Sequence, residues 1–188
     1  MPSPPLLARA GDSVLAIIDV QERLAAAMPP IARAAVFANA RILLAAAARL
    51  GIPVLATEQY PKGLGSTAAE LAEMLPADTP RIEKTCFSSA GAAGFSAALA
   101  ASGRAQVILA GMEAHVCVLQ TALELRAARP EVFVVADACC SRNPQNHSNA
   151  IERMRAAGVV VANTESVLFE WLRDAKHEHF RAISALLR

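Results

Sequence analysis

Short apolar runs alternate along the chain with longer segments in which apolar residues recur at helical spacing. The short runs predict strands, because buried parallel strands read as brief continuous apolar stretches. The longer segments carry helix formers and several end near glycines, such as Gly51, Gly103 and Gly158, which favour helix C-termini. The predicted strands are 14–19, 54–57, 81–83, 107–110, 132–136 and 159–161, and the predicted helices are 34–50, 67–75, 96–101, 116–128 and 150–157. Thr67 and Glu70 have the spacing of a capping box at the start of one of these helices.

This alternation predicts the α/β fold class, in a single domain over residues 1–188. Right-handed crossovers place helices on both faces of a parallel sheet, so we expect a doubly wound, six-stranded sheet with the common order 3-2-1-4-5-6. In such a sheet, ligands bind outside the carboxyl ends of the strands, where the winding reverses. That reversal lies between the first and fourth strands.

Composition limits the possible partners. Hydrophobic residues make up 54% of the chain, but much of this is alanine, and Arg33, Arg41 and Arg49 interrupt the longest apolar runs. No run approaches the ~20 residues of a membrane span, and no secretory signal is visible, so we expect no membrane partner and a cytoplasmic location. A net charge of +1 with interspersed signs predicts that nucleic acid is not a partner. Four cysteines without a disulfide framework indicate a reduced protein.

Three residues suited to thiol chemistry follow predicted strands at the same sheet edge. Asp19 ends the first strand, Lys84 follows the third, and Cys117 follows the fourth by one short loop. Unpaired N–H groups and the helix dipole at a helix start lower the pKa of a thiol, so we expect the pKa of Cys117 to lie below its usual value near 8.5. Each residue alone also fits an ordinary role, in a turn, on the surface or in the core. Their shared edge favours catalysis.

Other patterns are weaker. The glycines of the G-x-G-x-x-A pattern at 63–68 begin too far from the preceding strand for a dinucleotide site, so we expect a flexible loop over the crevice instead. His177 and His179 are two residues apart and lack further ligands nearby, which argues against a metal pair. Two adjacent cysteines, Cys139 and Cys140, are expected to be buried. Cys86 is expected in a pocket wall, and Asp137 and Arg142 could pair after the fifth strand.

Three motifs, in this order and spacing, resemble the isochorismatase-like cysteine hydrolases. They are DVQ at 19–21, KTCFS at 84–88 and GMEAHVCV at 111–118, within a resemblance that runs from about residue 14 to 161. The segment EQYPKGLG at 58–65 resembles the subgroup of isochorismatase-domain-containing proteins, most of which lack assigned substrates. The resemblance implies a Rossmann-like hydrolase.

The resemblance also implies a role for each matching residue. Cys117 would be the nucleophile, Asp19 the general base and acid, and Lys84 the cation that holds both acidic groups. A cis peptide would precede Glu113, and the backbone N–H groups of Glu113 and Cys117 would form an oxyanion hole. The small-molecule substrate would contact residues around the crevice, namely Gln21, Gln59, Tyr60, Phe87 and His115.

Departures from relatives refine the expected chemistry. Nicotinamidases of this superfamily carry metal-binding histidines, whereas residues 57–60 here read TEQY, so we expect no metal and no cofactor. Isochorismatases proper cleave a vinyl ether without needing the cysteine, so Cys117 favours acyl transfer through a thioester, with an amide C–N bond as the expected target. The alternatives are a binding or scaffold protein with little activity, and a redox sensor using Cys117 or the Cys139–Cys140 pair. The resemblance and the alanine-rich helices also suggest a homo-oligomer, a dimer or larger.

Overall fold

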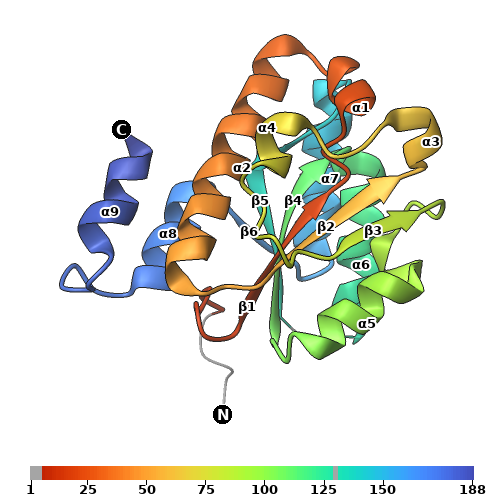
Figure 1. Cartoon of the computed structure of the whole chain (residues 1–188). Helices are drawn as coiled ribbons and strands as arrows, with labels where there is room; N and C mark the ends of the chain where they lie inside the picture. Colours follow the sequence, from red (N-terminus) through yellow and green to blue (C-terminus); the bar gives the residue numbers. More distant parts are fainter. Residues whose placement is uncertain (1–5, 129–130) are drawn as a thin grey trace.

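The computed structural model describes residues 6–128 and 131–188. Within them, six strands form one parallel sheet in the order β3-β2-β1-β4-β5-β6 (Figure 1). The predicted fold class, doubly wound topology and strand order are therefore confirmed. The strands are β1 (Ser13–Ile18), β2 (Val54–Gln59), β3 (Arg81–Lys84), β4 (Gln106–Met112), β5 (Val132–Cys140) and β6 (Val160–Ala162).

Helices cover both faces of the sheet, and each face has its own apolar core (Figure 1). Strand β1 shows the alternation that separates the two cores, because Leu15 and Ile17 face one and Val14 and Ala16 face the other. The helices that contribute side chains to the first core include α2 (Pro30–Leu50), α8 (Thr164–Leu172) and α9 (Phe180–Ser184). The second core is completed by α5 (Ala93–Ala101), α6 (Leu119–Ala128) and α7 (Pro144–Ala156).

Helix α2 is long and apolar enough to cross a membrane by length and composition alone, with a mean hydropathy of 1.5. In the fold it is a core helix, because Val36, Leu43 and Leu44 pack into the first core. Its start at Pro30 precedes the predicted one by four residues, since proline at the first helical position needs no hydrogen-bond acceptor. It ends at Gly51 in the left-handed conformation, where glycine is expected.

Shorter helical segments occupy the loops, and several were not predicted. The prediction of a capping box formed by Thr67 and Glu70 is wrong, because the Thr67 hydroxyl instead donates to the buried carboxylate of Glu58 at 2.7 Å. The helix predicted over 67–75 is correspondingly short. The loop expected to be flexible contains a helical turn. The segments are α1 (Glu22–Ala26), α3 (Pro61–Leu64), α4 (Ala69–Ala72), the 3-10 turns η1 (Ser89–Gly91) and η3 (Ala185–Leu187), and the π-helical turn η2 (Ala114–Val118).

Five strands run beyond their predicted ends toward the carboxyl edge, and β2, β4 and β5 do so by at least two residues, reaching Gln59, Met112 and Cys140. The predicted pairing of Asp137 with Arg142 is wrong. Asp137 Oδ1 accepts hydrogen bonds from the backbone N–H and hydroxyl of Thr164, so it anchors the start of α8. Arg142 pairs with a different carboxylate, that of Glu113.

Buried polar contacts tie the two ends of the described chain together at the opposite edge of the sheet. Trp171 Nε1 in α8 donates to Ser13 Oγ at 3.0 Å, and the Ser13 hydroxyl donates in turn to Gln106 Oε1. Gln106 Oε1 also accepts from the backbone N–H of Arg9. Ser13, Gln106 and Trp171 are all buried. The first strand is therefore held in place by a helix 158 residues further along.

Gly111 permits the close approach of β1 and β4 beneath the carboxyl edge. Its φ is +133°, and a Cβ placed there would lie 2.0 Å from the carbonyl oxygen of Ile18. Gly111 and Ile18 are partners in the β1–β4 register. Since backbone cannot move aside cheaply, the position accepts only glycine.

We therefore expect Gly111→Ala to abolish folding or to destabilise the protein severely. Gly51→Ala is the matched control, because Gly51 also has a positive φ but a Cβ added to it would meet no atom within 4 Å; it should cost only about 1 kcal/mol. Urea unfolding followed by circular dichroism measures both. Equal midpoints for the two variants would contradict the proposed clash.

Candidate active site

Asp19 lies immediately after β1 and is completely buried. Its φ of 51° is in the left-handed region, which few residues other than glycine, asparagine and aspartate adopt. The backbone N–H of Asp19 donates to Thr57 O, and the Thr57 hydroxyl donates to Asp19 Oδ1 at 2.7 Å. The carboxylate is thus held by β2 from the side.

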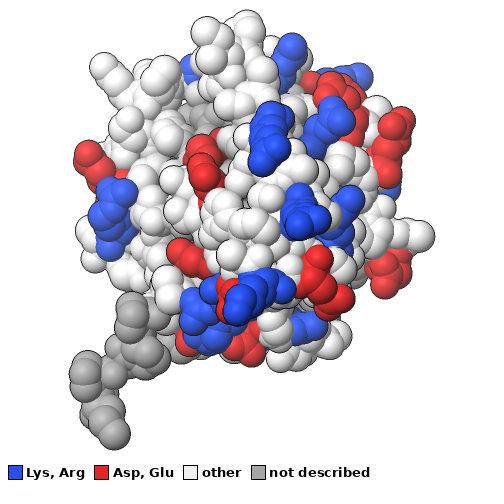
Figure 2. Space-filling model, turned by 90° about the vertical axis from the view of Figure 1, so that its left-hand side faces the viewer, with Lys and Arg blue, Asp and Glu red and all other residues white. Residues whose placement is uncertain are grey.

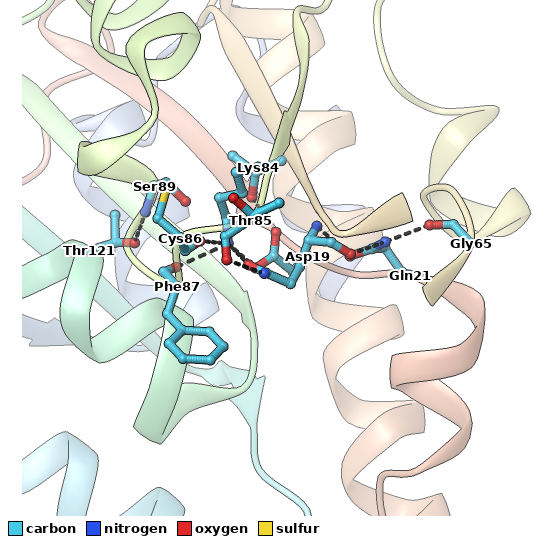
Figure 3. Close-up of polar contacts among 11 residues, drawn as sticks. Asp19, Gln21, Gly65, Lys84, Thr85, Cys86, Phe87, Ser89 and Thr121 are labelled. Carbon is cyan, nitrogen blue, oxygen red and sulfur yellow. Dashed lines mark hydrogen bonds and ion pairs between the residues drawn. The ribbon is translucent and has the colours of Figure 1, made fainter. Parts of the chain in front are cut away.

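Lys84 ends β3, two strands away from Asp19 in the sheet. Its Nζ lies 2.6 Å from Asp19 Oδ2, and neither side chain is exposed to solvent. Figure 3 shows the two side chains pointing toward one another. Nζ also donates to Gln59 Oε1 at 2.7 Å and to the carbonyl oxygens of Phe87 and Cys86 at 3.0 and 3.3 Å. The ammonium is therefore fully satisfied, as a buried cation must be.

Cys117 lies on the π-helical turn that follows β4, and only 4% of its surface is exposed. Its thiol interacts with the side chains of both Asp19 and Lys84. The structure therefore brings the three predicted residues together. Single π turns inside helices are rare and occur frequently at functional sites. Periodicity predicted an ordinary helix here, and nothing in the apolar spacing distinguishes the two.

The expected lowering of the thiol pKa is wrong. Burial raises the pKa of Cys117 to about 12, the negative charge of Asp19 contributes to the rise, and Lys84 offsets only part of this effect. The helix start does not overcome the loss of solvent around a thiolate. At neutral pH Cys117 is consequently a protonated thiol beside a carboxylate that can accept its proton.

The loop between β4 and Cys117 is anchored by Glu113. The Met112–Glu113 peptide is cis, as predicted. The Glu113 carbonyl accepts hydrogen bonds from Val116 and Val118, and its buried carboxylate contacts Arg142 Nη2 at 2.6 Å and the Arg142 backbone N–H at 2.9 Å. Burial alone would raise the pKa of Glu113, but the hydrogen bonds and charge of Arg142 outweigh it and lower that pKa. Sequence spacing gave no signal for this role of Arg142.

The two glutamines predicted to contact substrate lie beneath the site with their amides occupied. Gln21 Nε2 donates to the carbonyl oxygens of Gln59 and Gly65, and Gln21 Oε1 accepts from the Gln59 backbone N–H. Gln59 Nε2 donates to Thr85 O while its Oε1 faces Lys84. Both side chains therefore hold the protein's own groups.

The other residues predicted to contact substrate are accessible. Tyr60 and Phe87 are each 54% exposed, and the Phe87 ring points away from the ion pair in Figure 3. His115 is partly exposed, and its Nδ1 lies 3.0 Å from Ser141 Oγ. A cavity of about 650 Å³ is lined by Tyr60, Lys84 and Cys86 among others, which agrees with Cys86 as a pocket wall.

The structure also shows where the other cysteines and the pair of histidines near the end of the chain lie. The four cysteines are free, and Cys139 and Cys140 are buried in different cores because neighbouring strand residues face opposite sides. Across residues 6–128 and 131–188, no group of three or more His, Cys, Asp or Glu side chains could hold a metal ion. His177 and His179 contact one another, with ring centroids 5.7 Å apart.

Comparison with known proteins identifies the family. A family model described as the isochorismatase domain matches residues 13–166. The chain belongs to the isochorismatase family. Isochorismatase domain-containing protein 2 of Danio rerio is 41% identical over 176 residues, which cover 93% of this chain and 86% of that protein. Membership of this hydrolase family accounts for the three sequence motifs.

Solved structures of the same fold cover nearly the whole chain. The MAR1 ribonuclease of Caenorhabditis elegans is 34% identical with a TM-score of 0.90, covering 96% of this chain and 92% of that one. YcaC of Pseudomonas aeruginosa, solved with hexane-2,5-diol and covalent acrylamide, is 29% identical with a TM-score of 0.90 and covers 98% and 93%. YcaC of Escherichia coli, described as an octameric hydrolase of unknown specificity, is 26% identical with a TM-score of 0.90 and covers 98% and 91%.

We expect alkylation of Cys117 by iodoacetamide to accelerate with pH up to about 12, because the pKa of its thiol is raised to about 12. The Asp19 carboxylate contributes to that rise, so Asp19→Asn should lower the thiol pKa and speed alkylation at pH 8, whereas Lys84→Met should slow it. Site-resolved mass spectrometry gives the rates, with exposed Cys86 as the internal reference and circular dichroism as the check of folding. A wild-type rate that stops rising below pH 9 would contradict the expectation.

Proposed function

We propose that this protein hydrolyses a small amide through a covalent thioester on Cys117. The observation that carries the proposal is that the buried Cys117 thiol lies close enough to the Asp19–Lys84 ion pair for both charges to act on it. A nucleophile, a proton acceptor and a cation at one buried site are the parts that covalent acyl transfer needs. The active site would use no metal and no cofactor.

The first step follows from the protonation state of the thiol. Because Cys117 is protonated at neutral pH, its proton must leave as the sulfur attacks the carbonyl carbon, and Asp19 is the carboxylate in contact with it. Lys84 then faces a protonated Asp19 and offsets the negative charge that develops on the substrate oxygen. The backbone N–H groups of Glu113 and Cys117 would donate to that oxygen, as the family resemblance implies.

The second half returns the site to its starting state. Asp19 gives its proton to the amide nitrogen, the C–N bond breaks, and the acyl group stays on the sulfur as a thioester. Asp19 then takes a proton from water as the water oxygen attacks the thioester carbon. The C–S bond breaks, the carboxylic acid leaves, and the proton returns to Cys117.

The charge balance of the site favours an uncharged substrate. Asp19 is paired with Lys84, and Glu113 with Arg142, so neither pair leaves an excess charge for a carboxylate or an amine on the substrate. We propose that Tyr60, Phe87 and His115 contact the substrate, since they are accessible near the site. This role does not extend to Gln21 and Gln59, because their amides are occupied.

Two of the structural neighbours support this proposal. The Pseudomonas aeruginosa protein holds covalent acrylamide, an electrophile that reacts with thiols, and the Escherichia coli protein is described as a hydrolase. The latter is also described as octameric, and Ile31 on α2 of this chain is 87% exposed. We therefore propose that this protein also forms a homo-oligomer.

Two other functions have an observation in their favour. The low exposure of Cys117 and its raised pKa fit a binding protein whose thiol does no chemistry. A ribonuclease function is suggested by what the Caenorhabditis elegans neighbour and two Leishmania neighbours are called. On the face shown in Figure 2, Lys and Arg are interspersed with Asp and Glu, so this face offers no continuous basic track for RNA.

We expect the wild-type protein to hydrolyse at least one small neutral amide. Cys117→Ala and Asp19→Asn should each lower turnover of that amide at least about 10³-fold, because each removes a group that the reaction needs. Release of ammonia or amine from a panel of amides and imides measures turnover, and a single-stranded RNA is assayed in parallel.

Cys139→Ala is the matched control, because it removes a thiol that is as buried as that of Cys117 but interacts with Asp137 and Cys140 instead of Asp19 and Lys84, and it should leave turnover unchanged. Retained turnover in Cys117→Ala would eliminate covalent catalysis. RNA cleavage that survives in Cys117→Ala, without amide turnover, would favour the ribonuclease instead.

A further inference from the structure

Strand β2 lies between the two strands that supply the ion pair. Asp19 follows β1 and Lys84 ends β3, so their side chains meet across a strand that contributes neither of them. Adjacent strands lie ~4.8 Å apart, so strands β1 and β3 are separated by about 10 Å, and only a long side chain such as lysine closes that gap. The ion pair therefore passes over the carboxyl end of β2.

Two alternate residues of β2 contact the ion pair, one on each partner. Thr57 Oγ1 donates to Asp19 Oδ1 at 2.7 Å, which leaves Oδ2 to Lys84. Gln59 Oε1 accepts from Lys84 Nζ at 2.7 Å. Glu58, which lies between them in the strand, bonds instead to Thr67. The period of two in a strand thus places a donor against the carboxylate and an acceptor against the ammonium.

Each contact has the polarity that its partner requires, and further hydrogen bonds fix the Gln59 side chain. The Gln59 amide cannot turn its NH₂ toward the ammonium, because Nε2 donates to Thr85 O at 2.8 Å. Gln21 Oε1 accepts from the Gln59 backbone N–H at 2.7 Å. Thr57 and Gln59 are only 1% and 9% exposed, so water does not compete for these bonds.

We infer that Thr57 and Gln59 are positioning residues, which hold the Asp19 carboxylate and the Lys84 ammonium so that both keep facing the Cys117 thiol. The inference rests on the proposed function for its effect on turnover. In the first step, Asp19 must present a free electron pair to the thiol proton. With Oδ1 held by Thr57, the carboxylate keeps one orientation toward Lys84 and Cys117.

Thr57→Val keeps the shape of the side chain and removes its hydroxyl, so we expect kcat for the amide substrate to fall about tenfold or more. KM should change less than about twofold, because Thr57 does not contact the substrate, whereas Thr57→Ser keeps the donor and should recover kcat to within about threefold of wild type. Steady-state kinetics measures both constants.

Thr164→Val is the matched control. Thr164 is also buried, and its hydroxyl donates to a carboxylate, that of Asp137, at 2.9 Å. Urea unfolding of all three variants separates stability from turnover. If Thr57→Val lowers stability as much as Thr164→Val does but keeps the wild-type kcat, then Thr57 has only a structural role. That result would overturn the inference for Thr57.

Gln59→Glu tests the other contact without any natural substrate. A second carboxylate against Lys84 cancels the charge that lowers the Cys117 pKa, so addition of acrylamide to Cys117 at pH 9 should slow at least about threefold. Gln106→Glu changes another buried glutamine, at the opposite edge of the sheet, and should leave the rate unchanged. Equal acrylamide rates in Gln59→Glu and wild type would overturn the inference for Gln59, whatever the natural substrate is.

Discussion

The arrangement of the whole site depends on one buried ion pair, that of Asp19 and Lys84. Two charges without solvent contact are stable only when every donor and acceptor around them is satisfied. The surrounding chain meets this demand, because Lys84 reaches two backbone carbonyls and an amide while Asp19 receives a hydroxyl. The end of β2 and the loops after β1 and β3 are therefore tied to the ion pair.

Burial strengthens the attraction between Asp19 and Lys84, and it also raises the pKa of the Cys117 thiol. A thiolate at Cys117 would lose solvent and face a carboxylate, and a single lysine does not compensate for both effects. The resting thiol is consequently neutral and reacts slowly with oxidants, which attack the thiolate. In the proposed reaction, the cost of forming the thiolate is avoided because proton transfer and attack occur together. Asp19 thus disfavours a free thiolate in the resting protein and, in the proposed reaction, accepts the thiol proton as the sulfur attacks.

The sequence was sufficient for the sheet, because β-rich runs alternate with helical ones and the crossover rule leaves few topologies. It was also sufficient to expect Asp19, Lys84 and Cys117 at one edge, since carboxyl ends of parallel strands share that edge. The π turn under Cys117 was not predictable, because apolar spacing over five residues does not distinguish it from an α-helix. The sign of the thiol pKa shift depends on how deeply the sulfur is buried, which spacing does not reveal.

The contacts of Thr67, Thr57 and Gln59 have one physical cause. Local patterns assign a hydroxyl or an amide to its neighbours in sequence, whereas a buried charge recruits the polar groups nearest in space. The Thr67 hydroxyl was expected to cap a helix but donates to the Glu58 carboxylate instead. Thr57 and Gln59 hydrogen-bond to the two partners of the ion pair. Polar residues at the ends of central strands are therefore best interpreted after the charges around them are placed.

The contact between Trp171 and Ser13 bears on how the protein is made. Strand β1 lies at the middle of the sheet, yet a helix near the other end of the chain covers its beginning. During synthesis the ribosome releases the first strand long before it releases α8. The nascent chain must therefore keep this apolar strand shielded, by its early helices or by a chaperone, until α8 has been synthesised.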